Sequence, residues 1–156
     1  TLRLAQLATV LAQAPHLLSI ILDESGDLTT LRKIFQSPPS PYWRQHYTFG
    51  KPSSKVTSNG LSEESVQLLV INFVLPIWFA YGEFHDQEEW KDRCFSLLQS
   101  LPAEQNYVLR KFVRHAWIPK TAFDSQGMLE LYRRYCSAQK CLSCKIGQSL
   151  LRSPSK

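Results

Sequence analysis

Apolar residues recur at intervals of three and four along most of this chain, and that period constrains the fold more than any other feature. Leu4, Leu7 and Leu11 fall on one face of a helix at this spacing. Outside residues 41–60, apolar and polar residues do not alternate over five positions, as a half-buried strand would require. The sequence therefore predicts an all-α fold, an irregular array of about seven helices.

Prolines and polar caps set the expected limits of these helices. Asp27 and Asp86 are expected to cap the helices that follow them, and Pro102 to occupy a first helical turn. Pro76 is expected to kink the central helix by freeing the carbonyl of Asn72. The expected helices cover residues 2–14, 17–22, 28–35, 62–81, 87–101, 103–115, 121–132 and 142–151.

Residues 41–60 form one long aromatic-rich segment in which neither period is sustained, so we expect an ordered loop or a short helix followed by a loop. Rings and cations alternate here, as they often do on surfaces that bind single-stranded nucleic acid, which makes Trp43 and Arg44 candidate contacts. The same rings could anchor the loop on the helices. We favour anchoring, because large aromatic side chains are mostly used in packing.

The length of 156 residues suits one helical domain. Because the chain begins at Thr1 and its one methionine is Met128, we expect it to be a piece of a longer protein. No secretory signal is present, and the longest apolar run, residues 66–81, is shorter than the roughly 20 residues that span a bilayer. We therefore expect a cytoplasmic chain with no membrane partner.

Charge is distributed unevenly. Residues 1–104 contain 8 basic and 11 acidic groups, a net −3, whereas residues 105–156 contain 10 basic and 2 acidic groups, a net +8. A basic half of this kind could hold nucleic-acid phosphate, dock on an acidic domain, or be a solvated face. The candidate phosphate contacts are Arg110, Lys111, Arg114, Arg133, Arg134, Lys140 and Lys145.

Three of the four cysteines crowd together near the end of the chain. Cys136, Cys141 and Cys144 have the spacing of the first three ligands in plant-type iron–sulfur proteins, and they also resemble a zinc knuckle. A metal site needs a fourth ligand. Cys94 or a histidine such as His115 could return to it through the fold, or an upstream region of a longer protein could supply it. Alternatively the cysteines are small apolar core residues, with no cofactor.

Catalytic residues are not assigned by any motif. The sequence has no phosphate-binding glycine loop, no paired-carboxylate motif and no zinc-protease helix. A thiol enzyme that uses one of the clustered cysteines would need a positioned base, and no motif pairs a histidine with a cysteine.

Several distinctive blocks are spread over most of the chain. They comprise Tyr42-Trp43, residues 46–51, Asn72, Pro76, residues 101–104, Asn106, residues 125–127, Tyr135-Cys136, Lys140-Cys141, Cys144 and Ile146-Gly147. Together they resemble the C-terminal part of the bacterial family known as domain of unknown function 2851, whose activity is not established. Family members look longer than this chain, and their upstream region resembles restriction-endonuclease-like folds.

That resemblance implies a link to nucleases. Some nucleases of that fold class hold an iron–sulfur cluster with one upstream cysteine and three near the C-terminus, although the four-then-two spacing here departs from theirs. The leading hypothesis is a helical accessory domain that holds nucleic-acid phosphate near a catalytic domain elsewhere. The alternative is a structural or protein-interaction domain that docks on its own upstream domain, with cysteines in its core or on a structural metal. An independent thiol enzyme ranks last.

Overall fold

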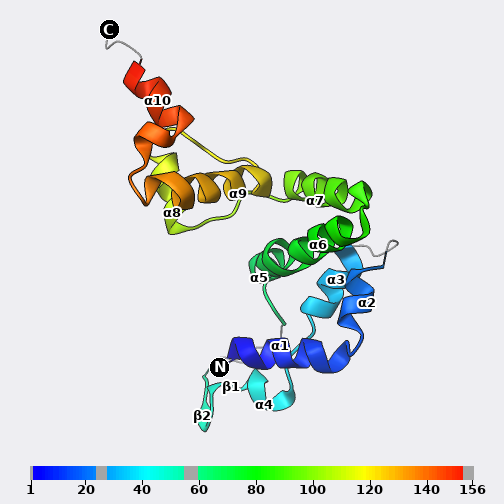
Figure 1. Ribbon diagram of the computed structural model, residues 1–156. Coiled ribbons are helices and arrows are strands. Elements are labelled where there is room, and N and C mark those ends of the chain that lie inside the picture. Colours follow the sequence, from blue (N-terminus) through cyan, green and yellow to red (C-terminus); the bar gives the residue numbers. More distant parts are fainter. Residues whose placement is uncertain (1, 24–27, 55–59, 153–156) are drawn as a thin grey trace. The chain divides into compact units, whose positions relative to one another are not determined.

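Helices dominate the computed structural model, which describes residues 2–23, 28–54 and 60–152 (Figure 1). The prediction of an all-α fold is confirmed, with shorter and more numerous elements than expected. They are α1 (Leu2–Gln13), α2 (Leu17–Ile21), α3 (Leu28–Phe35), α4 (Pro41–Arg44), β1 (His46–Thr48), β2 (Lys51–Pro52), α5 (Glu63–Leu69), the π-helical turn η1 (Val70–Val74), α6 (Leu75–His85), α7 (Glu88–Ser100), α8 (Tyr107–Val113), α9 (Ala122–Leu131), the π-helical turn η2 (Tyr132–Cys136), the 3-10 turn η3 (Cys141–Ser143) and α10 (Lys145–Arg152).

The chain forms two compact units. The first unit is Thr1–Lys91 and the second is Asp92–Lys156. The break falls inside α7, whose first turn belongs to the first unit. The expected cap Asp27 lies outside the described residues.

The core of the first unit is built around the continuous helical segment α5–η1–α6. Val66, Val70, Val74 and Trp78 are each at most 2% exposed, and the Trp78 indole Nε1 donates a 2.6 Å hydrogen bond to the carbonyl of Ile21. The turn before Pro76 is π-helical, so the disturbance expected there takes the form of a wider turn.

The N-terminal helix departs from the expected packing. Leu4 and Leu11 are 70% and 62% exposed, and the buried residues of α1 are Gln6 and Val10. The Gln6 side chain donates a 2.8 Å hydrogen bond to the carbonyl of Gly60, so this contact turns a polar position of α1 inward. Spacing located the helix correctly and its buried face incorrectly.

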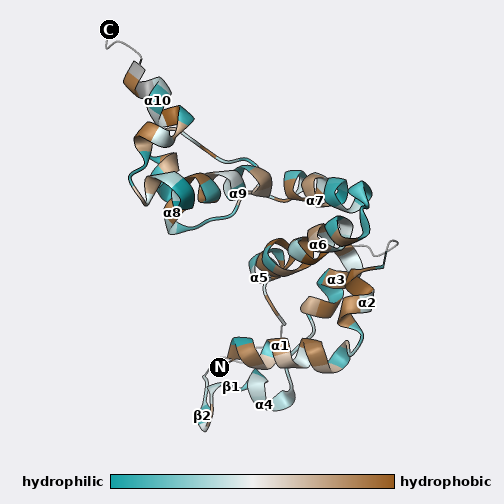
Figure 2. Cartoon of the chain, in the orientation of Figure 1, coloured by the Kyte–Doolittle hydropathy of each residue, from teal (hydrophilic) through white to brown (hydrophobic). Residues whose placement is uncertain are grey.

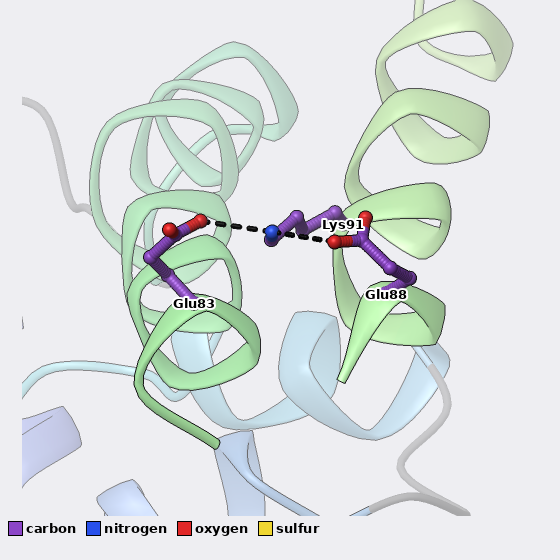
Figure 3. Close-up of polar contacts among 3 residues, drawn as sticks. All are labelled: Glu83, Glu88 and Lys91. Carbon is purple, nitrogen blue, oxygen red and sulfur yellow. Dashed lines mark hydrogen bonds and ion pairs between the residues drawn. The ribbon is translucent and has the colours of Figure 1, made fainter. Parts of the chain in front are cut away.

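The junction of α6 and α7 is a tight turn closed by an ion-pair network. Asp86 adopts φ 55°, a left-handed conformation that ends α6, so its predicted role as the cap of α7 is wrong. Lys91 Nζ lies 2.8 Å from a carboxylate oxygen of Glu83 and 2.8 Å from one of Glu88 (Figure 3). These carboxylates, Glu83 foremost, raise the pKa of Lys91 above its usual value. In Figure 2, brown predominates along α6 and teal along the start of α7.

The aromatic-rich segment contains the short helix α4 and the antiparallel pair β1–β2, a hairpin that the sequence did not predict. Its rings pack mainly on one another. Tyr42 stacks on His46 with ring centroids 4.1 Å apart, and its hydroxyl accepts a 3.0 Å hydrogen bond from the amide of Gly50. Trp43 meets Phe49 edge to face at 4.8 Å. These contacts hold α4 on the hairpin, and the anchoring of the rings on the other helices stays a prediction.

In the second unit, backbone hydrogen bonding joins the segment that follows α7 to the start of α9. The amide of Ala122 donates to the carbonyl of Leu101 at 2.9 Å, and Pro102 forms an isolated β-bridge with Thr121. Residues 103–106 are consequently not helical, and the helix expected over residues 103–115 begins only at α8. Asn106 caps α8 by accepting a 3.0 Å hydrogen bond from the amide of Leu109.

Thr121 begins α9, as expected, with a complete capping box. Its hydroxyl accepts from the amide of Asp124, and the Asp124 carboxylate accepts from the amides of Thr121 and Lys120 at 3.0 and 2.9 Å. These hydrogen bonds hold the pKa of Asp124 below its usual range. Among the residues of this unit that the structure describes, the buried ones are few and mostly small: Cys94, Leu97, Leu101, Leu109, Ala122, Ser125 and Cys144.

The helical run Glu63–His85 is long and apolar enough to cross a membrane by length and composition alone. Only 39% of its most apolar window is buried, but the buried side chains include Val66, Val70, Val74 and Trp78, which form the centre of the first unit. The run therefore supplies much of the core of the first unit.

Candidate functional site: a cavity lined by three cysteines

The second unit contains an open cavity of about 430 Å³ that collects the clustered cysteines. We call it the thiol cavity. Its lining includes Cys136, Cys141, Cys144 and His115, which come from three separate segments. The remaining lining residues are apolar or aromatic: Phe112, Trp117, Leu131, Tyr135, Ile146 and Gly147. Three thiols and one imidazole thus line a cavity whose other lining residues are apolar or aromatic.

The end of α8 positions the imidazole side of the cavity. The amides of His115 and Trp117 both donate to the carbonyl of Phe112, at 2.8 and 3.1 Å, and this turn requires Ala116 to adopt φ 63°. A left-handed conformation costs a residue with a Cβ roughly 1–2 kcal/mol. Trp117 then stacks on Phe112, with planes 17° apart. A strained turn therefore fixes the backbone of His115 beside the cavity.

The turns that carry the cysteines also line the cavity. Cys136 ends η2, and Gln139 then takes a second left-handed conformation, φ 53°, before Cys141 opens η3. The amide of Cys144 donates to the carbonyl of Cys141 at 3.2 Å, which closes the turn between them. Backbone strain of this kind clusters at functional sites.

Gly147 permits the close approach of α10 to this turn. A Cβ built on Gly147 would lie 2.3 Å from the carbonyl oxygen of Cys141, a distance that side chains do not tolerate. The Gln148 side chain adds a 2.6 Å hydrogen bond to the carbonyl of Leu142. The segment from Cys141 to Cys144 is therefore held on the first turn of α10 by backbone contact.

The thiols differ in exposure, and none is in a disulfide. Cys94 and Cys144 are buried, whereas Cys136 and Cys141 are exposed, so the interpretation of the cluster as apolar core residues suits Cys144 only. Burial, with the neighbouring Cys144 and Cys141 thiols, raises the pKa of Cys136, which disfavours a resting thiolate nucleophile there.

The structure distinguishes between the two candidates for a fourth ligand within this chain, Cys94 and His115. Cys94 lies in α7, is 3% exposed, and does not line the thiol cavity; burial raises its pKa to about 11. His115 does line the cavity. Among the described residues, no three or more His, Cys, Asp or Glu side chains form a group that could hold a metal ion as they stand.

Three of the predicted phosphate contacts already have partners within the unit. Lys111 Nζ lies 2.8 Å from the hydroxyl of Tyr132 and 4.6 Å from the ring centroid of Tyr107. Arg133 pairs with Glu130 at 2.8 Å, and Arg134 lies 6.0 Å from the ring centroid of Tyr135. Tyr132 raises the pKa of Lys111 by hydrogen bonding, so its charge persists but its amine is partly engaged.

The other four predicted contacts are exposed. Within the part of the chain that the structure describes, no ion pair or cation–π contact engages Arg110, Arg114, Lys140 or Lys145. Arg114 adjoins His115, Lys140 adjoins Cys141, and Lys145 adjoins Cys144 in sequence. The segments that line the thiol cavity therefore also carry unpaired positive charge.

Trp43 and Arg44 belong to the first unit. Trp43 is half-buried against Phe49, and Arg44 Nε donates a 3.3 Å hydrogen bond to the carbonyl of Pro39. Both side chains therefore serve the hairpin, and the prediction that they contact nucleic acid has no further support from their surroundings.

The second unit also contains a cluster of hydrogen-bonded polar residues whose members lie far apart in the sequence. The Ser125 hydroxyl, which is fully buried, accepts a 2.9 Å hydrogen bond from the amide of Glu104, and Gln126 Nε2 donates to the Glu104 carboxylate at 2.5 Å. Of these residues Glu104 lines a cavity of about 280 Å³, together with Asn106. Because the partners lie more than 20 residues apart, no local pattern could pair them.

The fold and the cavity describe a helical protein of two units, the second of them basic and rich in thiols. The chain belongs to the family described as Protein of unknown function (DUF2851), which matches residues 1–107. The match contains the first unit and stops at the start of α8, so it does not include the thiol cavity. No curated protein and no solved structure matches the chain.

Proposed function

We propose that the second unit is an accessory nucleic-acid-binding domain that holds phosphate groups near a catalytic domain elsewhere in a cytoplasmic bacterial protein. The observation that carries this proposal is the unpaired charge of Arg110, Arg114, Lys140 and Lys145. Exposed guanidinium and ammonium groups release counterions when they meet a phosphate backbone, and this release supplies most of non-specific affinity.

The acids of this half do little to offset that charge. Residues 105–156 contain Asp124 and Glu130 against ten basic residues. The Asp124 carboxylate is occupied by the capping box of α9, and Glu130 neutralises Arg133. The field around the exposed cations is therefore positive, as required for attracting a polyanion.

The test is fluorescence anisotropy of a labelled single-stranded oligonucleotide, with the full chain titrated at several salt concentrations. We expect binding that weakens as salt rises. In the triple variant Arg114→Glu, Lys140→Glu and Lys145→Glu, the slope of log K against log salt should become smaller in magnitude by about 2, the loss of roughly three single-strand contacts.

The matched control reverses three exposed cations of the first unit: Arg3→Glu, Lys33→Glu and Lys51→Glu. Both triple variants have the same net charge, so a simple effect of total charge would weaken both equally. The proposal requires a much larger loss in the second-unit variant. Equal losses, or binding that ignores salt, would overturn it and favour the alternative, a domain that docks on its own upstream domain.

A further inference from the structure

We propose that four groups of the thiol cavity bind one zinc ion: Cys136, Cys141, Cys144 and His115. The proposal does not depend on nucleic-acid binding. It selects one fourth ligand from those that the sequence left open, and it places the site wholly within the second unit.

The donor set itself indicates the metal. Zinc in structural sites is tetrahedral and takes three thiolates and one imidazole as one of its common ligand sets, with distances of about 2.3 Å to sulfur and about 2.0 Å to nitrogen. Magnesium and calcium prefer oxygen ligands, and among the described residues no acidic side chain lines the thiol cavity. The site is therefore suited to a borderline-soft ion.

The choice of His115 over Cys94 follows from position. His115 is exposed and lines the same cavity as the three clustered thiols. Cys94 is buried in α7 and lies outside that lining. Bringing Cys94 to the ion would mean extracting a core residue, whereas His115 already lines the cavity that holds the three thiols.

The local backbone supports the ligand segments. Two of the three non-glycine residues with positive φ in the described chain are Ala116, next to His115, and Gln139, between Cys136 and Cys141. The close approach of Gly147 to the Cys141 carbonyl fixes the turn that joins Cys141 to Cys144. The chain thus adopts strained or closely packed turns at each segment that supplies a ligand.

Charge also favours the complex. One Zn²⁺ with three thiolates and a neutral imidazole carries a net charge of −1. Arg114, Lys140 and Lys145 adjoin the ligands in sequence and have exposed side chains, so the complex would form in a positive field.

Binding would draw the ligand segments together. The four groups line the cavity without meeting at one point. The cysteines come from the C-terminal turns and His115 from the end of α8, so the ion would close these turns onto α8. Because a closed site forms only in the folded unit, zinc would stabilise that unit.

The first experiment measures zinc in the full chain after removal and stoichiometric return of the metal, and then replaces zinc with Co²⁺. We expect one zinc per chain. The cobalt form should show a thiolate charge-transfer band and the visible bands of tetrahedral coordination. The absence of stoichiometric zinc would overturn the proposal, as would a chromophore with equimolar iron and sulfide.

Matched single variants identify the ligands. We expect His115→Ala to weaken zinc binding by more than about a hundredfold, because losing even an outer-shell partner costs about 10–100-fold. His16→Ala, which removes an exposed histidine of the first unit, should leave zinc affinity unchanged. Likewise, Cys141→Ser should lose the metal and Cys94→Ala should keep it. Retention by the His115 variant, or loss by the Cys94 variant, would contradict the assignment.

One further variant separates a lost ligand from a lost fold. His115→Cys restores four donors, so it should bind zinc again and strengthen the charge-transfer band of the cobalt form by a fourth thiolate. If His115→Cys binds no better than His115→Ala while circular dichroism shows the same helix content in both, position 115 is not a ligand.

Discussion

The two units use their large side chains in different ways. In the first, Trp78 is 1% exposed and lies in a continuous core of valine, leucine and aromatic residues. In the second, Trp117 is 42% exposed and lines a cavity. The contrast indicates that side-chain packing is the main source of stability in the first unit, whereas the second, with few buried apolar residues among those described, has room for a ligand.

Replacing each of these two tryptophans should give the largest difference in stability between the two units. Trp78→Ala should lower the free energy of unfolding of the first unit by about 3–5 kcal/mol, because it empties a fully buried site and removes the hydrogen bond to Ile21. Trp117→Ala should cost about 1 kcal/mol, since its ring is only partly buried.

Hydrogen exchange followed residue by residue is the measurement, because it reports the two units separately. Trp78→Ala should reduce amide protection in α5 and α6 and leave α9 unchanged. If protection in α9 fell by the same amount, the two units would unfold as one cooperative body, and the contrast between them would not extend to stability.

Two helical glycines provide the next comparison. A Cβ on Gly82 would lie 2.8 Å from both the carbonyl oxygen of Gln87 and the Cβ of Trp90, so Gly82→Ala should destabilise the first unit by about 1–3 kcal/mol. Gly127, in α9, has no such neighbour within 4 Å, and Gly127→Ala should stabilise the second unit by about 0.5–1 kcal/mol.

Urea unfolding of each variant, compared with the unsubstituted chain, measures these opposite signs. The comparison fails if Gly127→Ala destabilises the chain, because that result would mean that α9 is more tightly surrounded than the structure shows.

The smallest expected effect is a pH dependence confined to α9. The folded pKa of Asp124 lies below its unfolded value, so the carboxylate stabilises the fold above pH about 4 and this contribution is lost as pH falls through the folded pKa. Asp124→Asn should therefore be less stable than the unsubstituted chain at neutral pH, with the difference shrinking in acid.

Thermal unfolding over a pH series measures that difference. Asp92→Asn, which removes an exposed carboxylate from the same unit without removing a cap, is the control. A difference for Asp124→Asn that stayed constant down to the acid limit would show that the capping bonds do not depend on the charge.

Much of the helical framework could be predicted because its signals are local. Three- and four-residue spacing located α1 and α3, and Thr121 was recognised as the start of α9. Asp86 and Pro102 were misassigned because each also suits a second role. Asp86 can end a helix in the left-handed conformation, and Pro102 can lie in an extended bridge whose partner, Thr121, is distant in sequence.

The candidate site was predictable in part for the same reason. The spacing of Cys136, Cys141 and Cys144 identified the cluster, and the basic residues of the second half were visible as a composition bias. His115 was one option among several, because only the fold of α8 brings it to the thiol cavity. Cys94 could not be excluded until its burial was known.

The π-helical turn η1 has a consequence for the phase of the whole central helix. Val66, Val70, Val74 and Trp78 follow one another at four-residue steps, and each such step would drift by about 40° around an α-helix of 3.6 residues per turn. A turn that holds more residues takes back part of this drift and keeps the four side chains in one row. Deleting a single residue from η1 would rotate everything beyond it by about 100°, and Trp78 would leave the core.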